Sequence, residues 1–412
     1  MRILIIHQAF ASLDEPGGTR HLEFARLLAA RGHSVTVIAS PVSYVTGLPS
    51  AAYTAPREAS NDLAGVTILR ARVYSAHHKS FVHRVLAFFS FMLSSFWIGL
   101  GLRDVDLVWG TSPPIFQGVT AWLLARLQGA RFLFEVRDLW PQFAVAVGVL
   151  RNPLLISASE WLERFLYRRA DCVIVNSPGF IEHVRGLGAR RVELVPNGAD
   201  PEMFDPQADG SDFRRRHDFG DRFVAMYAGA HGMSNDLEVL LEAGRLLQDS
   251  AIQIVLVGDG KEKASLVARA QLLGINNMLF LPAVPKREMP AVLAGADAGI
   301  AILRPIEAYK TTYPNKVFDY MAAGRPVLLA IDGVIREVVE AAGCGLFVRP
   351  GDPVALAQAA RTLASDRESA RRMGMNGKAY LEQHFSRDRI AEHLIEVLTS
   401  TVRRSRQHDR NR

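Results

Sequence analysis

Short apolar runs that alternate with amphipathic segments are the feature that most restricts how this chain can fold. Each run is a few residues long and rich in Ile, Leu, Val and Phe. The segments between the runs have helical spacing, as where Leu22, Ala25 and Ala29 fall on one face. Strands that alternate with helices form parallel sheets covered on both faces. In the first half of the chain the runs are 3–6, 35–39, 66–69, 107–109, 132–136, 172–175 and 192–195.

A break rich in proline, glycine and asparagine interrupts this alternation. It begins at 196–201 (Pro-Asn-Gly-Ala-Asp-Pro) and continues into the polar run 207–222, a composition typical of a linker. The pattern then starts again, with apolar runs at 223–227, 252–257, 278–281, 298–302, 326–330 and 345–348. We therefore predict two doubly wound, Rossmann-like α/β domains, over 1–195 and 201–386. They should face each other across a cleft lined by the carboxyl ends of both sheets.

Composition and charge exclude several classes of protein. The two cysteines, Cys172 and Cys344, cannot support a disulfide scaffold or a Cys-rich zinc site. The net charge of +6 comes from 70–103 and from the last ten residues, 403–412, so the rest of the chain is close to neutral. This is not the broad basic surface of a nucleic-acid-binding protein. The tail 403–412 is expected to be solvated and flexible.

The most apolar segment, 85–102, contains no charged residue and is flanked by Arg84 and Arg103. Its length is at the lower limit for a membrane span, and its serines and glycines argue against one. The first interpretation is a crossover helix buried on a parallel sheet. The second is a helix docked on a membrane surface through 77–103, with His77, His78, Lys79, His83 and Arg84 near anionic headgroups.

Glycine-containing loops after predicted strands are candidate anion sites, because glycine lets the backbone approach a ligand and a helix N-terminus favours negative charge. Gly17 and Gly18 precede the first helix, although a plain tight turn explains this pair equally well. Gly229 and Gly232 follow the first strand of the second domain, with His231 between them and Asn235 at the start of the next helix. A similar turn at 258–260 needs no ligand, and we expect none there.

The segment 313–327 is the most informative. Pro314 suits the start of a helix, and Gly324 with Pro326 suits its end. Lys316 then lies in the first turn, where its charge and backbone N–H groups can act on one anion. Asp319 lies on the same face and can accept hydrogen bonds from a ribose diol. The alternative is a surface ion pair between these two residues.

In the first domain, the segment 134–141 (Phe-Glu-Val-Arg-Asp-Leu-Trp-Pro) follows another apolar strand. It places Glu135, Arg137 and Asp138 at the carboxyl end of that strand. A carboxylate beside an arginine at this position can bind an acceptor hydroxyl or take its proton.

These segments, in this order, resemble the GT-B glycosyltransferases of family 4 over nearly the whole chain. Within that family the chain looks most like enzymes of bacterial surface-polysaccharide assembly, in the branch that includes N-acetyl-fucosamine transferases. The segments that carry the resemblance are 16–18, 135–141, 195–200, 227–229, 257–260, 296–297 and 313–327.

The resemblance implies retaining transfer from a nucleotide sugar, without a metal or another cofactor. It implies that the second domain binds the donor and the first binds the acceptor. It also implies that the final helix, 387–402, packs back on the first domain.

The chain departs from the family pattern at three places. The family often has two glutamates eight positions apart where this chain has Thr311 and Asp319, so Glu307 becomes a candidate for the missing sugar contact. The family often has Arg and Lys after the turn that contains Gly229, where this chain offers His231 and Asn235. A histidine often stands at the position of Arg137, which leaves Asp138 as the best polar group near the reacting centre.

The predicted catalytic residues are Asp138, His231 and Lys316, and the predicted acceptor-side residues are Glu135, Arg137 and Asp138. The predicted donor-binding residues are Gly17, Gly18, Gly229, Gly232, Asn235, Thr311, Asn315, Lys316 and Asp319.

The predicted function is transfer of a sugar, an N-acetylated deoxyhexose, from a UDP-sugar to a saccharide carried on polyprenyl diphosphate. The enzyme is expected in the cytoplasm, held peripherally at the inner face of the cell membrane. One alternative is a nucleotide-sugar epimerase of the same architecture. Another is a non-catalytic subunit that binds nucleotide sugars, which the loss of a glutamate at Thr311 leaves open.

Overall fold

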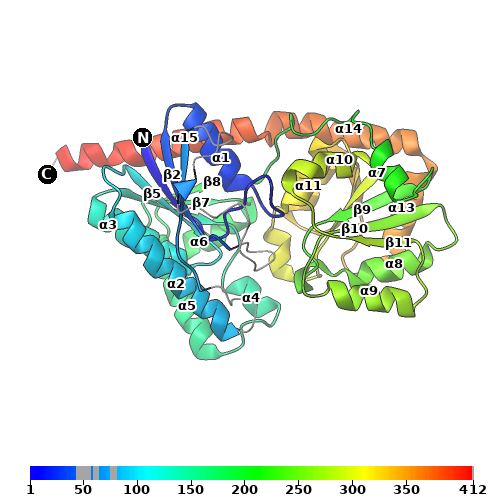
Figure 1. The fold of residues 1–412 in the computed structure, drawn as a ribbon, viewed down its shortest axis with the longest axis horizontal. Helices are drawn as coiled ribbons and strands as arrows, with labels where there is room; N and C mark the ends of the chain where they lie inside the picture. The colour runs from blue at the N-terminus through cyan, green and yellow to red at the C-terminus, as the bar shows by residue number, and fades with distance from the viewer. Residues whose placement is uncertain (43–56, 59–64, 75–80, 411–412) are drawn as a thin grey trace. The chain divides into compact units, whose positions relative to one another are not determined.

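The structure is a computed structural model that describes residues 1–42, 57–58, 65–74 and 81–410. It divides into two compact units (Figure 1). Unit 1 comprises Met1–Ser12, Gly17–Pro196 and Asp388–Arg412, and unit 2 comprises Leu13–Pro16 and Asn197–Arg387. The four residues Leu13–Pro16 join unit 2 because Arg287 pairs with Asp14 at 2.7 Å.

Unit 1 is built on one sheet with the strand order β3-β4-β2-β1-β5-β6-β7-β8. Every neighbouring pair is parallel except β3 with β4. The apolar runs form these strands because both faces of the sheet are buried. The strands are β1 (Arg2–Ile6), β2 (Ser34–Ala39), β3 (Arg57–Glu58), β4 (Val66–Arg70), β5 (Leu107–Ser112), β6 (Arg131–Val136), β7 (Cys172–Val175) and β8 (Val192–Leu194).

The helices of unit 1 connect these strands and cover the sheet, with α3 packed beside both α2 and α5. The long helix α15 returns from the end of unit 2 and packs on unit 1, where Arg191 donates to the hydroxyls of Ser400 and Thr401. The helices are α1 (Arg20–Ala30), α2 (Phe81–Leu100), α3 (Phe116–Gln128), α4 (Gln142–Ala146), α5 (Pro153–Arg169), α6 (Ile181–Gly186) and α15 (Arg387–Arg410), with the 3-10 turn η2 (Pro178–Phe180).

Unit 2 contains a fully parallel sheet with the order β11-β10-β9-β12-β13-β14. Successive residues of its central strand β9 pack into different cores, Val224 and Met226 on one face, Phe223 and Ala225 on the other. The strands are β9 (Phe223–Ala228), β10 (Ile252–Val257), β11 (Met278–Leu281), β12 (Ala298–Ile302), β13 (Val327–Ala330) and β14 (Gly345–Phe347).

Helices lie on both faces of the unit 2 sheet and continue the alternation of strand and helix. They are α7 (Ser211–Arg216), α8 (Glu238–Leu246), α9 (Lys263–Leu272), α10 (Met289–Ala294), α11 (Asn315–Ala322), α12 (Val334–Ala342), α13 (Pro353–Ser365) and α14 (Arg367–His384). Three 3-10 turns, η3 (Met233–Asn235), η4 (Lys286–Glu288) and η5 (Glu307–Thr311), lie between them. The predicted pair of doubly wound parallel sheets is therefore confirmed.

Two expectations about polar segments need correction. The polar run 207–222 is not only a linker, because it contains α7. Arg214 of that helix pairs with Asp297 at 3.0 Å and donates to the carbonyl of Gly220, which anchors the run to unit 2. The tail 403–412 is helical as far as Arg410, because no proline or glycine ends α15 earlier.

Helix α2 has one buried face and one exposed apolar face, so the interpretation of 85–102 as a buried crossover helix holds for one face, and docking on a membrane stays a prediction. Ala87, Phe91 and Ser95 are fully buried, and Gly99 lies so close to α3 that a Cβ atom there would be 2.4 Å from Leu124. The outward stripe consists of Leu86, Phe89, Leu93, Trp97 and Leu100. No helix in the described part of the chain is long and apolar enough to cross a membrane. His77, His78 and Lys79 lie outside the described residues, as does the side chain of Arg84.

Candidate active site

The predicted donor residues of unit 2 follow strands that are neighbours in its sheet. Strand β9 pairs with β10 on one side and with β12 on the other, all parallel. The loops after these strands, 229–237, 258–262 and 303–314, therefore share the carboxyl edge. Helix α11, which carries Lys316 and Asp319, begins at the end of the third loop. The side chain of Asn197 fixes that loop by donating to the carbonyl of Tyr313 at 2.6 Å.

The first two loops interlock through backbone contacts. The amide of His231 donates to the carbonyl of Asp259 at 2.8 Å. The amide of Gly229 donates to the carbonyl of Val257 at 2.9 Å. A Cβ atom on Gly258 would lie 1.9 Å from the oxygen of Gly229, and one on Gly260 would lie 2.3 Å from the oxygen of His231. Glycines 258 and 260 thus serve the packing of loop against loop, and this role requires no ligand.

Lys316 extends its side chain over the ring of Tyr227, with Nζ 3.8 Å from the ring centroid. The amine is buried and has no hydrogen-bond partner among the described residues. It adjoins the glycine loop, since a Cβ atom on Gly229 would be 3.0 Å from Nζ. Burial lowers the pKa of Lys316 to about 7. A buried basic group is therefore held at the carboxyl edge without a carboxylate bonded to it among the described residues.

His231 is a second buried basic group beside this lysine. It is fully buried, and neither ring nitrogen has a hydrogen-bond partner in the described structure. Burial lowers its pKa to about 4, and the nearby charges of Lys263 and Lys316 act in the same direction. The negative charge of Asp259 acts to raise the pKa of His231, but it offsets the other effects only in part. At neutral pH the imidazole is therefore uncharged.

Asp319 is partly buried, and Lys286 pairs with it at 2.7 Å. The ammonium group of Lys286 also lies 5.2 Å from the ring centroid of Phe204. The sequence offered a surface ion pair between Lys316 and Asp319 as an alternative. That ion pair does not form. Asp319 is anchored by η4, whereas Lys316 points to Tyr227.

The remaining predicted donor residues surround α11 and the glycine loop. Thr311 donates its hydroxyl to the carbonyl of Ala308 at 2.6 Å, at the end of η5. Glu307, the suggested replacement for a missing glutamate, is 85% exposed and pairs with Lys310 at 2.8 Å across one turn. Asn315 is exposed at the first position of α11, and the amide of Asn235 donates to the carbonyl of Gly232 at 2.9 Å.

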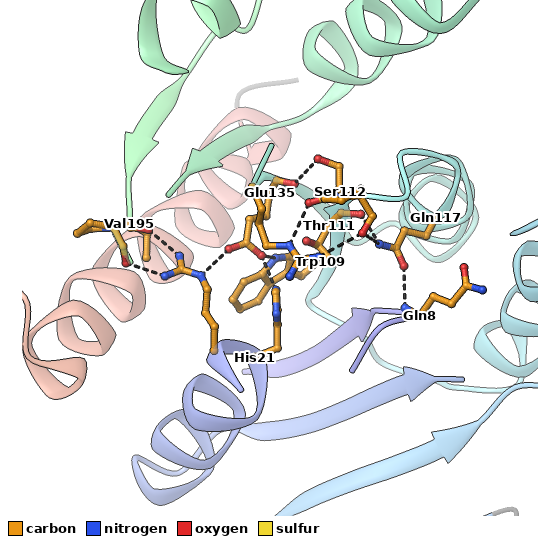
Figure 2. A network of polar contacts seen from close by, with 12 residues as sticks. Gln8, His21, Trp109, Thr111, Ser112, Gln117, Glu135 and Val195 are labelled. Carbon is orange, nitrogen blue, oxygen red and sulfur yellow. Dashed lines mark hydrogen bonds and ion pairs between the residues drawn. The ribbon is translucent and has the colours of Figure 1, made fainter. Parts of the chain in front are cut away.

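One predicted residue of unit 1, Glu135, is a buried carboxylate at the centre of a polar network (Figure 2). Glu135, near the end of β6, is completely buried. One of its oxygens accepts from Arg20 Nε at 2.9 Å. The other lies 2.5 Å from His21 Nε2 and 3.2 Å from Trp109 Nε1. Burial acts to raise the pKa of this carboxyl, but its close contacts with His21 and with the Arg20 guanidinium hold that pKa far below its usual range.

This network fixes the first turn of α1 to the end of β6. Arg20 also donates to the carbonyls of Val195 and Pro196, each at 2.6 Å, at the end of unit 1. Both oxygens of Glu135 are occupied, so an acceptor hydroxyl cannot bind there without displacing a protein donor. The structure thus places Glu135 behind the predicted acceptor side, as a support for it.

Arg137 and Asp138 occupy different positions after β6. Arg137 donates to the carbonyls of Ser112 and Pro113, at 3.0 and 3.2 Å, and so braces the loop after β5. Asp138 is exposed. Desolvation by surrounding protein raises the pKa of its carboxyl to about 6, against the attraction of Arg137. Of the three predicted acceptor-side residues, Asp138 offers the accessible carboxylate.

Gly17 and Gly18 lie just before α1. Gly17 has a φ of +148°. A Cβ atom added to Gly17 would lie 3.2 Å from the Cβ atom of Ala11. A Cβ atom on Gly18 would have no described atom within 4 Å, so this glycine borders open space. The pair is therefore compatible with an approaching ligand.

The sequence did not identify several residues of these clusters. Arg20, His21 and Trp109 hold Glu135, the ring of His7 lies tilted against that of His21 with centroids 4.1 Å apart, and Tyr227 lies under Lys316. One signal was present for His21, which is four positions before Ala25 and so shares the apolar face of α1. The partners of Glu135 are distant in sequence, and no local pattern connects them.

Comparison with known proteins identifies the family. A model described as a glycosyl transferase 4-like domain matches residues 17–198, and one for glycosyl transferases group 1 matches residues 222–366. The chain belongs to the group 1 glycosyltransferases of family 4. The two matches together cover more than half of the chain. The protein is thus a retaining glycosyltransferase of a metal-independent family.

Relatives of this glycosyltransferase include WcaI of Escherichia coli K12, named as a colanic acid biosynthesis glycosyl transferase. It is 28% identical over 312 residues, which span 73% of this chain and 76% of WcaI. Sucrose-phosphate synthase of Thermosynechococcus elongatus has a TM-score of 0.78 at 18% identity, covering 97% and 99% of the two chains. HepE of Anabaena, in complex with UDP-glucose, has a TM-score of 0.72 at 18% identity, covering 97% and 100%. These structures confirm the GT-B fold, and the relatives connect the chain to bacterial surface-polysaccharide synthesis.

Proposed function

We propose that this glycosyltransferase moves an N-acetylated deoxyhexose from a UDP-sugar to a saccharide carried on polyprenyl diphosphate, in the synthesis of a bacterial surface polysaccharide. The observation that carries the donor part is the amine of Lys316, buried at the carboxyl edge of unit 2 without a hydrogen-bond partner among the described residues. A diphosphate is the anion that such a group lacks. The complex of HepE with UDP-glucose supports UDP as the nucleotide.

On the donor side, Lys316 meets the diphosphate together with the loop that contains Gly229 and Gly232. Asp319, held by Lys286, accepts from the ribose hydroxyls. Asn235, Asn315 and Thr311 surround the sugar. Thr311 is neutral and carries a methyl group, which favours a sugar with fewer hydroxyls, as in a deoxyhexose.

On the acceptor side, Asp138 holds or deprotonates the attacking hydroxyl, and Arg137 fixes the neighbouring loop. Gly17 and Gly18 leave room for the donor at the start of α1. The main catalytic contribution is stabilisation of the charge that develops on the departing diphosphate. Lys316 and His231 are the side chains that supply it.

The acceptor lipid requires the enzyme to work at the inner face of the cell membrane, in the cytoplasm. The outward stripe of α2 supports a peripheral contact there, because its five apolar side chains project from one helix that has no acidic residue. Basic residues at 77–103 would meet anionic headgroups, at ~1 kcal/mol each. Lipid is therefore the occupant that we propose for this stripe.

A non-catalytic nucleotide-sugar-binding subunit is the second candidate. It is favoured by Thr311, which stands where the family often has a glutamate. An epimerase has less support, because both matching family models describe glycosyl transferases.

The donor assignment is tested by titrating the purified protein with UDP, GDP and ADP in a calorimeter. We expect UDP to bind tightest, and Lys316→Ala to weaken it by ~1.5–3 kcal/mol, the contribution of a hydrogen bond to a charged group. Equal affinity for all three nucleotides, or unchanged UDP affinity in the variant, would contradict the assignment.

A further inference from the structure

The surroundings of Lys316 determine what its amine can do in the empty site. Its nearest neighbour is the ring of Tyr227, and on its own helix Tyr320 bonds its hydroxyl to the carbonyl of Ile300. Asp319, the carboxylate on that helix, is paired with Lys286. No carboxylate of the described residues is hydrogen-bonded to the Lys316 amine.

The charged groups on the neighbouring loops are also committed elsewhere. Lys263 of α9 donates to the carbonyls of Gly258 and Leu281, both at 2.8 Å. Asp259 accepts from the amide of Gly260 at 2.7 Å, and His231 is uncharged at neutral pH. Among the described residues no acid is hydrogen-bonded to Lys316, and its neighbour His231 is a basic group.

A buried amine that lacks an anion loses part of its preference for the charged form, because burial removes its hydration. The pKa of about 7 follows from this burial. A diphosphate would reverse the balance, since an opposite charge within a few ångströms favours protonation. The same side chain should therefore differ in charge between the empty and the filled site.

We propose that nucleotide binding at this site is coupled to uptake of one proton by Lys316. In the empty site the neutral amine lies over Tyr227. When a diphosphate arrives, the amine takes a proton from solvent and turns to the phosphate oxygens. When the nucleotide leaves, the proton returns to solvent. The inference rests on the proposed function, because it takes the diphosphate of a nucleotide as the anion.

The coupling gives a defined pH dependence. Protonated Lys316 binds the diphosphate more tightly, so affinity should be highest below the pKa of the empty site and fall as the pH rises above it. The expected loss is about tenfold per pH unit above about 7, until the pKa of the filled site is reached. At pH 8 the terminal phosphate of UDP, with a second pKa of ~6, is already ionised and contributes no proton.

The experiment is calorimetric titration of the full chain with UDP at pH 8, in buffers with different heats of ionisation. The dependence of the measured enthalpy on buffer heat gives the number of protons taken up. We expect about one proton to be taken up for each UDP that binds. Uptake near zero, with UDP still bound, would overturn the proton coupling and leave the proposed function intact. If UDP does not bind, the donor assignment fails and this inference falls with it.

Variants assign the proton to a residue. Lys316→Arg keeps a permanent charge, so UDP should still bind but with proton uptake near zero and an affinity that no longer changes between pH 7 and 9. Lys316→Met should also abolish uptake, and it provides a second comparison if the larger arginine disturbs the glycine loop. His231→Gln should leave the proton count unchanged. Uptake that persists in both Lys316 variants, or disappears in His231→Gln, would overturn the assignment to Lys316.

Discussion

Two buried charged residues show opposite ways of placing a titratable group inside this protein. Glu135 is surrounded by donors that use both of its oxygens, which keeps it ionised and rigid. Lys316 has no acceptor in the described part of the chain, and its amine lies over an aromatic ring. A group of the first kind supports structure, and one of the second kind is available for a ligand. Sequence spacing could not separate the two, because the side chains around each come from segments that are distant in sequence.

The first prediction concerns the stability of unit 1. Glu135→Gln should destabilise it by ~3–5 kcal/mol, because Arg20 would be left buried without its anion and three donors would face one acceptor oxygen. The measurement is urea unfolding. The matched control is Glu392→Gln, which breaks an exposed pair with Arg31 in the same unit and should cost less than about 1 kcal/mol. Equal effects of the two substitutions would contradict the structural role of Glu135.

The pH dependence of this stability has a definite sign. The folded-state pKa of Glu135 is lowered, so its contribution is present above the unfolded-state value of ~4.3 and is lost as the pH falls further. We therefore expect the difference between wild type and Glu135→Gln to shrink below about pH 4. A difference that grows on acidification would contradict the network.

A further residue-scale prediction concerns Asp138. Its pKa of about 6 means that the carboxylate forms as the pH rises through 6, so sugar transfer should increase over that range. Asp138→Asn should lower turnover with little effect on UDP affinity, because the residue belongs to unit 1. Turnover of Asp138→Asn equal to wild type would remove Asp138 from the acceptor side.

At the scale of elements, α2 shows where prediction from sequence reached its limit. The strands were found because parallel strands buried on both faces are short apolar runs. The segment 85–102 has no charged residue, so it carries no charged face to reveal which side is buried. Its exposed side became clear only once α3 was seen against Gly99. Helix α7 was missed for the opposite reason, since its sequence, Ser-Asp-Phe-Arg-Arg-Arg, is mostly polar.

The prediction for α2 is binding to lipid vesicles. Wild type should sediment with vesicles of phosphatidylglycerol and phosphatidylethanolamine, less so as salt rises, because the charge attraction is screened. Trp97→Glu should release the protein while leaving UDP affinity unchanged, since Trp97 is 70% exposed. Leu272→Glu is the control, because Leu272 is 87% exposed on unit 2 and should not affect sedimentation.

Two outcomes would contradict lipid as the occupant of the α2 stripe. One is vesicle binding that ignores both salt and Trp97→Glu. The other is absence of vesicle binding together with self-association that Trp97→Glu abolishes, which would make a second copy of the chain the occupant.

At the scale of the whole molecule, the chain ends in unit 1, because α15 returns to it after unit 2 is complete. This helix places five apolar side chains in the interior: Ile390, Ala391, Leu394, Val397 and Leu398. The family resemblance implied this return, whereas composition alone did not. Strand and helix patterns could not predict that α15 belongs to unit 1, since such patterns report only local burial.

Truncation tests the role of α15. Deleting 388–412 should destabilise unit 1 by on the order of 10 kcal/mol, at ~1.5–3 kcal/mol for each large buried side chain, and so prevent its folding. Deleting only 404–412 should leave the thermal unfolding midpoint within a few degrees of wild type. Normal folding without 388–412, judged by thermal unfolding and circular dichroism, would contradict the assigned packing.

The central claim is sugar transfer from a UDP-sugar to a lipid-linked acceptor. The most direct measurement incubates the purified enzyme with radiolabelled UDP-sugars and bacterial lipid extract, and follows both UDP release and label in the organic phase. The account predicts that one N-acetylated deoxyhexose donor gives equal amounts of released UDP and lipid-bound sugar, and that Lys316→Ala loses both. UDP binding without transfer from any donor would contradict it and favour the non-catalytic subunit.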